Sequence, residues 1–509
     1  MIAKVISGAT VGLESVPVEV EVNIESHGFP AFKIVGLPDK AVEEAKERVR
    51  SALKNSSAEF PARRITVNLA PADLPKKGPA YDLPIALGIL LANDQLRADV
   101  SDALILGELS LNGQLRHTPG VLPMALLARK YKFKKIFLPK INAKEASIVK
   151  GVQILPVKSI ATLFEHFTRI KPIKPQPYTN FEDLLDVDEE VDFDLADVRG
   201  QEQAKRALEI AAAGGHNILM KGPPGAGKTL LARTIPSILP RLTADEALEV
   251  TKIYSITGNL PHNEPLVKHR PFRSPHHTTS RIGLIGGGSH PQPGEISLAH
   301  RGVLFLDEFP EYPRHVLESL RQPVEDGVVT ISRALGTLTF PAKFILVAAQ
   351  NPCPCGFSGD PKRRCICTQH QITKYKKRVS GPLLDRIDLH VEVPAVDHEK
   401  LTSEESVGES SKTVRARAQA ARERQEKRFE GTKLTCNAEM TAKNIKKYCG
   451  LDEEEQKFLR QAAVQMDLSA RAYHRILKVA RTIADLAGVE EIENSHLAEA
   501  LQYRPQQEV

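Results

Sequence analysis

The chain has 509 residues and a formal net charge of +6; 41% of its residues are hydrophobic and 26% are charged. This length predicts about two to four domains, and the longest apolar run, 83–92, is about half as long as a membrane-spanning helix. Because no long apolar stretch precedes a cleavage site at the N-terminus, we expect a cytoplasmic protein without a signal peptide or membrane segment. The modest positive charge permits a polyanionic partner without requiring one.

Residues 1–170 are predicted to form a mixed α/β domain. Some segments alternate apolar and polar residues with the period of a half-buried strand, and others repeat apolar residues at helical spacing. The predicted elements are strands at 16–24, 65–69, 103–106 and 136–138 and helices at 39–55 and 83–92.

A break in composition follows this domain. The segment 171–177 reads KPIKPQP, and its prolines cannot sustain a regular ladder of hydrogen bonds. Between Phe181 and Asp197 there are nine Asp or Glu residues and no Lys or Arg. We therefore expect a linker over 171–195 that is a solvated tether, with an acidic docking element as the alternative.

Three further regions are expected after the linker. An α/β nucleotide-binding core is predicted for 196–400, with a cysteine-rich insertion at 353–367. A charged connecting stretch follows at 401–432. The last region, 433–509, is expected to be helical, because its apolar residues recur at the spacing of packed helices.

A glycine-rich run in the core matches the phosphate-binding motif G-x-x-x-x-G-K-[ST]. It lies between a predicted strand at 217–220 and a predicted helix opening at 230–234, so backbone N–H groups and the helix N-terminus would face an anion. Lys228 is predicted to reach the β- and γ-phosphates of ATP, and Thr229 to offer its hydroxyl to Mg²⁺. The run consists of Gly222, Pro223, Pro224, Gly225, Ala226, Gly227, Lys228 and Thr229.

The second half of the predicted site is the run GVLFLDE at 302–308. Its apolar residues predict a buried strand that ends in two carboxylates, at the edge where open α/β sheets bind ligands. Asp307 is predicted to bind Mg²⁺, and Glu308 to polarise the attacking water as a general base. A third strand, 344–349, precedes Asn351, whose amide could orient that water; a simple turn before the next proline is the alternative.

Four of the six cysteines fall in one short segment as two C-x-C pairs: Cys353, Cys355, Cys365 and Cys367. Four thiolates from one loop suit tetrahedral Zn²⁺, which would rigidify an insertion that has little core of its own. His370 could replace one thiolate, and unliganded thiols or a redox switch are the alternatives. A catalytic metal is not expected, because four protein ligands leave no open position.

Two basic runs and one predicted hairpin are candidates for contacting nucleic acid. Lys and Arg residues in such runs neutralise phosphates without sequence preference. The run 362–378 is expected to contact nucleic acid, whereas for the run 412–428 a solvated helix face is the preferred interpretation. A hairpin of two strands is predicted at 327–340. The candidate DNA contacts are Arg333, Lys362, Arg363, Arg364, Lys374, Lys376, Lys377 and Arg378.

Several long runs resemble the magnesium-chelatase-like AAA+ ATPases of the YifB/ComM family, and the resemblance covers nearly the whole chain. They include NLAPADLPKKGPAYDLPIALGIL (68–90), RPFRSPHHTTSRIGLIGGG (270–288), PAKFILVAAQNPCPCG (341–356) and LSARAYHRILKVARTIADL (468–486). The resemblance implies a homo-oligomeric ring, commonly a hexamer, with ATP bound between subunits. It also implies that Asn351 is the sensor-1 residue, Arg386 an arginine finger acting on a neighbouring subunit, and Arg471 the sensor-2 arginine of a helical lid.

The N-terminal domain resembles the Lon-protease-like domain, of ribosomal-protein-S5-domain-2 type, that this family carries. In the proteases a serine nucleophile sits in a PKDGPSAG run. The comparable run here is PKKGPAYD, 75–82, with Ala80 in place of the serine. Because alanine has no nucleophile to activate, we expect a non-proteolytic domain.

The function expected from the resemblance is an ATP-driven motor on DNA, a helicase in branch migration during recombination or natural transformation. A chelatase-type subunit for metal insertion and a protein-remodelling ATPase are the alternatives. Related ring helicases point a hairpin such as 327–340 into the central channel. The roles of His276, His277 and Arg281, in the SPHHT run and just after it, stay open between channel lining and loop packing.

Overall fold

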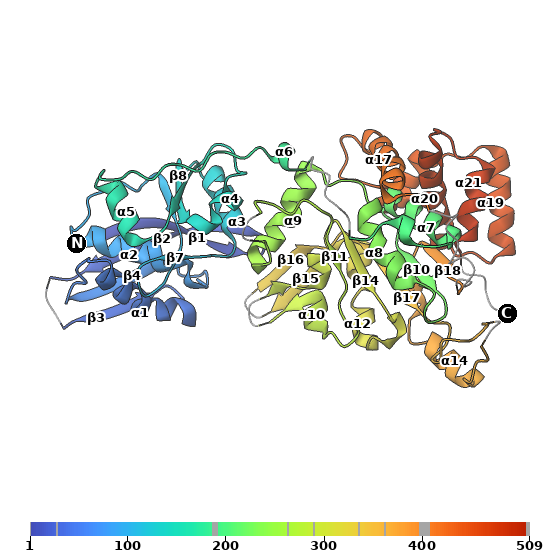
Figure 1. The fold of residues 1–509 in the computed structure, drawn as a ribbon, viewed down its shortest axis with the longest axis horizontal. Helices are drawn as coiled ribbons and strands as arrows, with labels where there is room; N and C mark the ends of the chain where they lie inside the picture. The colour runs from blue at the N-terminus through green and yellow to red at the C-terminus, as the bar shows by residue number, and fades with distance from the viewer. Residues whose placement is uncertain are drawn as a thin grey trace. The chain divides into compact units, whose positions relative to one another are not determined.

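The computed structural model describes residues 2–26, 29–185, 192–261, 264–288, 291–333, 336–360, 363–395 and 408–504. The chain, drawn in Figure 1, divides into two compact units. Unit 1 is Met1–Val187 with Ala244–Lys268, and unit 2 is Asp188–Thr243 with His269–Val509. Within those ranges, no helix is both long and apolar enough to cross a bilayer.

Unit 1 is built on a mixed seven-stranded sheet with the order β3-β4-β2-β1-β5-β8-β9. β2 pairs antiparallel with β1 and β4, whereas β5, β8 and β9 run parallel to one another. Alternate residues of β2 are buried because successive side chains of a strand point to opposite faces. The strands are β1 (Ile2–Val11), β2 (Glu14–Ile24), β3 (Ala31–Val35), β4 (Arg64–Ala70), β5 (Ala103–Ile105), β6 (Glu108–Leu109), β7 (Leu115–Arg116), β8 (Lys135–Pro139) and β9 (Gln153–Val157).

The helices of unit 1 follow the hydrophobic pattern of the sequence. α1 begins after Asp39, whose side chain accepts from the N–H of Val42 at 2.8 Å. α2 is buried along almost its whole length, as its unbroken apolar run requires. The six elements predicted here are confirmed as β2, β4, β5, β8, α1 and α2, whereas β1, β3 and β9 of the sheet and the helices α3 and α5 were not predicted. The helices are α1 (Lys40–Asn55), α2 (Asp82–Ala92), α3 (Val121–Lys130), α4 (Ala143–Ala146), α5 (Ile160–Phe167), α6 (Phe181–Leu185) and α9 (Ala244–Thr257).

α9 belongs to unit 1, although it lies inside the region 196–400 that was predicted to be the nucleotide-binding core. It packs against α3, and Ser255 Oγ donates to Oε1 of Glu145 at 2.6 Å. The N–H of Gly120 donates to the carbonyl oxygen of Ser255 at 2.9 Å. Glu145 is buried, which raises the pKa of its carboxyl group. The contact is therefore an internal part of unit 1.

The predicted linker 171–195 is not a free tether where the structure describes it. The N–H of Gln176 donates to the carbonyl oxygen of Ile154 at 2.9 Å, so the proline-rich segment lies against β9. The acidic stretch begins with α6, which packs against α9. The expectation of a solvated tether is wrong for this part, and 186–191 lies outside the described residues.

Unit 2 contains a parallel five-stranded sheet with the order β11-β14-β17-β10-β18. Because its strands are parallel, their carboxyl ends share one edge. β10 is the first of these strands in the chain but lies between β17 and β18, so the connections leave it toward both sides of the sheet. The loop after β10 therefore lies at a topological switch point, where α/β sheets bind ligands. The strands are β10 (Ile218–Lys221), β11 (Phe272–Arg273), β14 (Val303–Leu306), β17 (Ile345–Gln350) and β18 (Leu389–Glu392).

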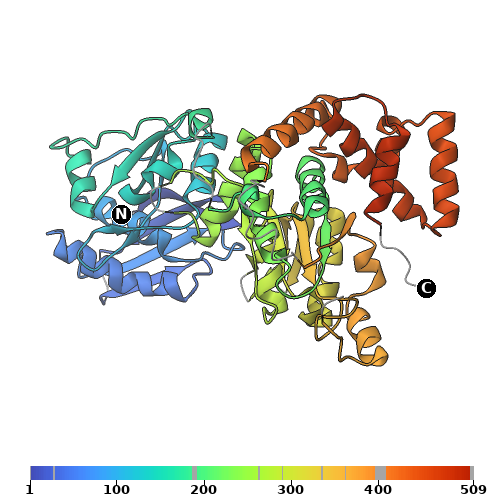
Figure 2. The same cartoon turned by 45° about the vertical axis from the view of Figure 1, so that its right-hand side comes forward.

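The C-terminal helices of unit 2 form a bundle, drawn in orange to red in Figure 2. α17 packs against α7, α8 and α20, and α20 packs against α21. Arg422 donates to the carbonyl oxygens of Ala212 and Ala213, and Arg428 pairs with the buried Asp485. The solvated helix face preferred for 412–428 is therefore wrong for these arginines. The helices are α17 (Ser411–Arg428), α18 (Ala442–Tyr448), α19 (Glu453–Gln465), α20 (Ala470–Ala487) and α21 (Asn494–Gln502).

The remaining elements of unit 2 are short helices and two hairpins. The hairpin predicted at 327–340 is confirmed, since β15 pairs antiparallel with β16. A smaller hairpin consists of β12 and β13. These elements are α7 (Glu202–Gly214), α8 (Lys228–Ile238), α10 (Arg281–Ile285), β12 (Gly286–Gly287), β13 (Gln292–Pro293), α11 (Glu295–Leu298), α12 (Arg314–Glu318), α13 (Arg321–Asp326), β15 (Val328–Arg333), β16 (Gly336–Pro341), α14 (Gln369–Lys376) and α15 (Gly381–Leu384).

Candidate functional site

The glycine-rich loop connects β10 to α8 at the carboxyl edge of the sheet. A Cβ atom on Gly222 would lie 2.0 Å from the carbonyl oxygen of Val393, so a larger residue does not fit there. Gly225 and Gly227 have φ angles of 77° and 87°, which residues with side chains rarely adopt. α8 begins at Lys228, so the first N–H groups of the helix face the loop, as in anion-binding sites.

Lys228 lies in this loop with its side chain almost fully covered. Its Nζ donates to the carbonyl oxygens of Gly222 and Pro223 at 2.7 and 2.9 Å and to Oδ1 of Asn351 at 3.1 Å. Burial lowers the pKa of its amine, while the charge of Asp307 opposes that shift. An anion entering the loop would meet a partly desolvated cation, for which electrostatic attraction is stronger than in water.

Asp307 and Thr229 meet at the end of β14. Thr229 Oγ1 donates to Oδ2 of Asp307 at 2.8 Å, and the N–H of Glu308 donates to Oδ1 of Asp307 at 2.9 Å. A hydroxyl and a carboxylate are the oxygen ligands that Mg²⁺ prefers, so these two side chains fit such an ion. The contact joins the glycine-rich loop to the strand carboxylates.

Glu308 is held by a histidine that lies far from it in the sequence. Its backbone is left-handed, with a φ of 50°, and its Oε2 lies 3.0 Å from Nδ1 of His277. The rings of His276 and His277 have centroids 4.1 Å apart, and the hydroxyl of Tyr312 donates to the carbonyl oxygen of Pro275 at 2.5 Å. The structure thus places His277 against the candidate general base, a contact that no local sequence signal could reveal.

Asn351 follows β17 and connects the glycine-rich loop to α14. Besides its contact with Lys228, its backbone N–H donates to the hydroxyl of Tyr375 in α14. Burial raises the pKa of Tyr375 to about 12, so this hydroxyl stays protonated. Lys228, Thr229, Asp307 and Asn351 therefore form one connected group.

Neither candidate arginine is joined to this group within one chain. Arg386 lies between α15 and β18, pairs with Glu325, and donates to the carbonyl oxygen of Pro382 at 2.6 Å. Arg471 is exposed at the second position of α20. Among the described residues, no hydrogen bond or ion pair connects either arginine to the loop or to the carboxylates of β14.

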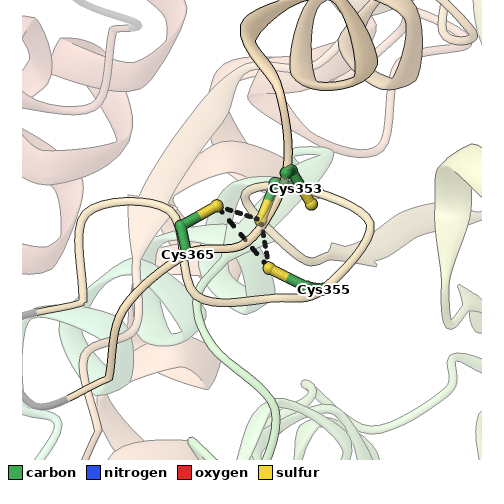
Figure 3. A group of neighbouring side chains, drawn as sticks. Cys353, Cys355 and Cys365 are labelled. Atoms are coloured by element: carbon green, nitrogen blue, oxygen red, sulfur yellow. Dashed lines mark hydrogen bonds between the residues drawn. The ribbon is translucent and has the colours of Figure 1, made fainter.

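Cys353, Cys355 and Cys365 point toward one another (Figure 3). Their Sγ atoms lie 3.4, 3.6 and 3.7 Å apart, and with Cys367 all four lie within 4.8 Å of one another. Four sulfur atoms around tetrahedral Zn²⁺, each at ~2.3 Å, would be separated by about 3.8 Å. The donor set and its spacing therefore fit a four-thiolate metal site.

Backbone donors surround two of these sulfur atoms. The N–H groups of Phe357 and Ile366 lower the pKa of Cys355 to about 6, and the N–H of Ser358 donates to Cys353 Sγ at 3.3 Å. Such donors stabilise the thiolate form that metal binding requires. His370, the proposed substitute ligand, is not part of the converging group.

A cavity of about 680 Å³ lies between α14 and the segment 310–314. Arg378 at its wall pairs with Glu311 at 2.5 Å, and Lys374 and Lys377 are exposed. The lining of the cavity therefore carries excess positive charge. Its cationic lining residues are Arg314, Lys374, Lys377 and Arg378.

Of the other candidate DNA contacts, those that the structure describes do not line this cavity. The guanidinium of Arg363 lies 5.2 Å from the ring centroid of Phe357, Arg364 is exposed beside it, and Arg333 is exposed at the end of β15. Lys376 lines a second cavity, which also contains Asn351. Lys362 lies outside the described residues.

Family descriptions of magnesium chelatases match most of the chain. "Magnesium chelatase, subunit ChlI" matches residues 194–401, "Subunit ChlI of Mg-chelatase" matches 20–142, and "Magnesium chelatase, subunit ChlI C-terminal" matches 408–504. Competence protein ComM of Haemophilus influenzae is 46% identical over 505 residues, which cover 99% of this chain and 97% of that protein. Uncharacterized protein YifB of Escherichia coli is 46% identical over 501 residues, covering 97% and 96%. The chain belongs to the YifB/ComM family.

The YifB/ComM family is a group of magnesium-chelatase-like AAA+ proteins, and it implies ATP and Mg²⁺ as cofactors. Likeness to a chelatase itself is more restricted. The Magnesium-chelatase 38 kDa subunit of Cereibacter sphaeroides is 26% identical over 176 residues, which cover 31% of this chain and 53% of that subunit.

Proposed function

We propose that the chain is one subunit of an ATP-hydrolysing AAA+ ring, commonly a hexamer, that translocates along or unwinds branched DNA. The observation that carries the proposal is the meeting of Lys228, Thr229 and Asp307 at the carboxyl edge of one parallel sheet. A relative of nearly the same length is named a competence protein, which supports DNA as the substrate and the cytoplasm as the location.

The residues of the glycine-rich loop and β14 divide the chemistry of phosphoryl transfer to water. Bound Mg²⁺ would neutralise charge on the β- and γ-phosphates. Thr229 and Asp307 would hold the ion, Lys228 would bind phosphate oxygens, and the carboxylate of Glu308 would accept a proton from the attacking water. Asn351, next to Lys228, orients that water.

Arg386 and Arg471 complete the site in this proposal. Arg471, in the helical lid, serves as the sensor-2 arginine, and Arg386 reaches the nucleotide of a neighbouring subunit. An arginine supplied in this way is worth about 10³–10⁵ in rate. The side chain of Glu325, the present partner of Arg386, is 51% exposed, so a phosphate can replace it.

The cationic cavity beside α14 supports binding of DNA through its phosphates. Lys374, Lys377 and Arg378 would neutralise backbone charge without reading sequence. Further contacts come from Arg333 on the β15–β16 hairpin and from the neighbouring basic residues Lys362, Arg363, Arg364 and Lys376. A structural Zn²⁺ held by Cys353, Cys355, Cys365 and Cys367 would fix the loop that precedes α14.

The first domain is proposed to be a non-proteolytic domain of Lon-protease-like fold. Ala80 stands where the protease serine would be, and its carbonyl oxygen accepts from the N–H of Gly107 at 2.8 Å. No nucleophile is therefore available at that position. The domain boundaries proposed are 1–170, 171–195, 196–400, 401–432 and 433–509, except that the segment 244–268, which contains α9, belongs to unit 1.

Two alternative functions would use the same nucleotide site. A protein-remodelling ATPase would use the same chemistry on polypeptide, and Ala80 does not argue against it. A chelatase-type motor subunit is less favoured, because the chain matches ComM and YifB over nearly its whole length but a chelatase subunit over only 31%.

The ATPase rate distinguishes these functions when it is measured with single-stranded DNA, forked DNA, unfolded protein or no addition. We expect stimulation by DNA, strongest with the fork, that disappears at high salt because phosphate contacts are screened. The variant Lys374→Glu/Lys377→Glu should lose this stimulation and keep the basal rate. Stimulation by polypeptide alone would reverse the order of the proposals.

A matched control keeps the charge change but moves it elsewhere. Lys443 and Lys446 are exposed on α18, away from the cavity lining. Lys443→Glu/Lys446→Glu should retain DNA stimulation. Equal losses in the two double variants would show that only net charge matters and would remove the cavity from the proposal.

A further inference from the structure

Ile366 is an aliphatic residue that the structure leaves almost entirely in contact with solvent. It is 85% exposed, and among the described residues only Phe29 is a more exposed large hydrophobic residue. It lies between Cys365 and Cys367, two of the four cysteines whose Sγ atoms converge. An apolar side chain therefore stands in water at a point where the chain is held on both sides.

The backbone of Ile366 is fixed by the thiol cluster. Its N–H group donates to Sγ of Cys355, and Sγ of Cys365 lies 3.6 Å from that same sulfur atom. Between 364 and 368, exposed residues alternate with the two partly covered cysteines. Because successive side chains of an extended segment point to opposite sides, Arg364 and Ile366 are directed away from the sulfur atoms on one common side.

Positive charge precedes Ile366 in the chain. The segment 362–378 contains seven Lys or Arg residues and no Asp or Glu. The guanidinium of Arg363 lies 5.2 Å from the ring centroid of Phe357, and Arg364 is exposed. Within the described part of the chain, neither arginine forms an ion pair with a carboxylate, so both charges are available to a partner.

Positive charge also follows Ile366, on α14. His370, Lys374 and Lys377 recur at helical spacing on α14 and line the cavity of about 680 Å³. Four residues of chain span at most about 14 Å, so Ile366 lies within that distance of His370, where the lining contributed by α14 begins. One stretch of nucleic acid can therefore contact both Ile366 and the cationic cavity.

An apolar side chain between cations is complementary to a base step between its phosphates. DNA-binding proteins insert Ile, Leu or Phe side chains between bases and unstack them, while their cations contact the backbone. Docking of an apolar protein surface would need a wider apolar patch. The exposed neighbours of Ile366 on the same side are Arg364 and Thr368, which are polar, so the surface favours DNA.

We infer that Ile366 is a wedge that enters the base stack of a DNA fork where the duplex meets the single strands, while Arg363 and Arg364 bind the adjoining phosphates. This inference deepens the proposed function and rests on it, since it requires that the chain acts on branched DNA. Base pairs must be separated at a fork but not along a single strand. Ile366 would therefore determine the preference of the motor for a fork.

A fork that carries 2-aminopurine beside the junction tests the wedge directly. The fluorescence of this base is quenched in the stack and rises when the base is unstacked. With an ATP analogue that is not hydrolysed, we expect the full-length protein to raise the fluorescence. Ile366→Ala should reduce this rise about tenfold, which is within the range caused by loss of a side chain stacked on a base. Ile366→Met, which keeps a long apolar side chain, should retain most of the rise.

Affinity and ATPase rate distinguish a wedge from a residue that only supports the fold. The affinity of Ile366→Ala for the fork, measured by fluorescence anisotropy, should change less than about threefold, because phosphate contacts supply most of the binding. Its ATPase stimulation by the fork should fall to the level given by single-stranded DNA. The basal rate and the stimulation by single-stranded DNA should stay unchanged.

Val464→Ala provides a matched control for removal of an exposed aliphatic side chain. Val464 of α19 is 80% exposed and lies outside both the thiol cluster and the cavity lining. This variant should match the unmodified protein in fluorescence, affinity and ATPase rate. Thermal unfolding of Ile366→Ala should also match, because the side chain contacts water rather than the cluster.

The outcomes separate the inference from the function on which it rests. If DNA neither binds to nor stimulates the unmodified protein, the proposed function is wrong, and the inference is overturned with it. If the fork stimulates the protein but Ile366→Ala gives the full fluorescence rise, or loses stimulation by single-stranded DNA equally, the motor stands and Ile366 is not the wedge. A loss confined to the fork and restored by Ile366→Met supports the wedge.

Discussion

Lys228 and Glu308 carry opposite charges at the same edge of the sheet but perform separable tasks. Lys228→Ala should abolish nucleotide binding or turnover, because it removes the buried cation that the glycine-rich loop holds where phosphate would bind. Glu308→Gln should bind ATP normally and lower turnover by about 10²–10⁴-fold, because an amide cannot accept the proton from water. Titration with a fluorescent ATP analogue and phosphate-release kinetics measure the two effects. Normal turnover by Glu308→Gln would falsify its assignment as the base.

His277 should affect turnover through Glu308 rather than through nucleotide binding. The 3.0 Å contact orients a carboxylate that is otherwise half exposed, so His277→Ala should lower kcat about tenfold and leave KM for ATP unchanged. His277→Asn, which can still donate to the carboxylate, should recover part of kcat.

The neighbouring histidine is the control for this prediction. Nδ1 of His276 contacts Oγ1 of Thr278 at 2.9 Å, so His276→Ala should have the smaller effect on kcat. Equal effects of the two alanine variants, or a change in KM alone, would show that the loop serves packing and does not orient Glu308.

At the scale of elements, the cysteine segment and α14 should respond together to loss of a metal. The segment leads directly into α14, whose Tyr375 contacts Asn351. Cys365→Ser should lose bound zinc and DNA stimulation while keeping basal ATPase activity, because the nucleotide residues lie outside the cluster. Elemental analysis and the stimulated ATPase rate measure these quantities.

Cysteines elsewhere in the chain supply the control. Cys436 and Cys449 are buried in the lid and lie outside the converging group. Cys436→Ser should retain both zinc and DNA stimulation. Full zinc content in Cys365→Ser, or an absence of zinc in the unmodified protein, would contradict the proposed site.

Sequence patterns predicted those elements whose burial is local and periodic. The alternation in β2 and the apolar run of α2 are visible in single segments, and a strand ending in two acids predicts the edge where Asp307 lies. The contact between His277 and Glu308 depends on how two loops approach in space. The arginines of α17 illustrate the same limit, because a basic helix suggests a solvated face unless its buried carbonyl and carboxylate partners are known.

At the scale of the whole molecule, the segment that contains α9 interrupts the sequence of unit 2 but folds as part of unit 1. The polypeptide leaves unit 2 after Thr243 and returns at His269. Between these points α9 buries Val250 and Ile253 completely within unit 1. The five strands of the nucleotide-binding sheet, by contrast, all belong to unit 2.

A shortened chain of residues 192–509 should therefore bind ATP but aggregate in solution. Without α3 and Glu145, the apolar side of α9 is exposed, and each aliphatic residue so exposed costs about 1.5–3 kcal/mol. We expect aggregation on size-exclusion chromatography and increased binding of a hydrophobic dye. Replacing 244–268 by a Gly/Ser linker should restore a well-behaved, ATP-binding protein, because the sheet and the glycine-rich loop are retained. If the shortened chain shows the same low aggregation and dye binding with α9 as with the linker, then α9 does not need burial in unit 1, and the prediction is wrong.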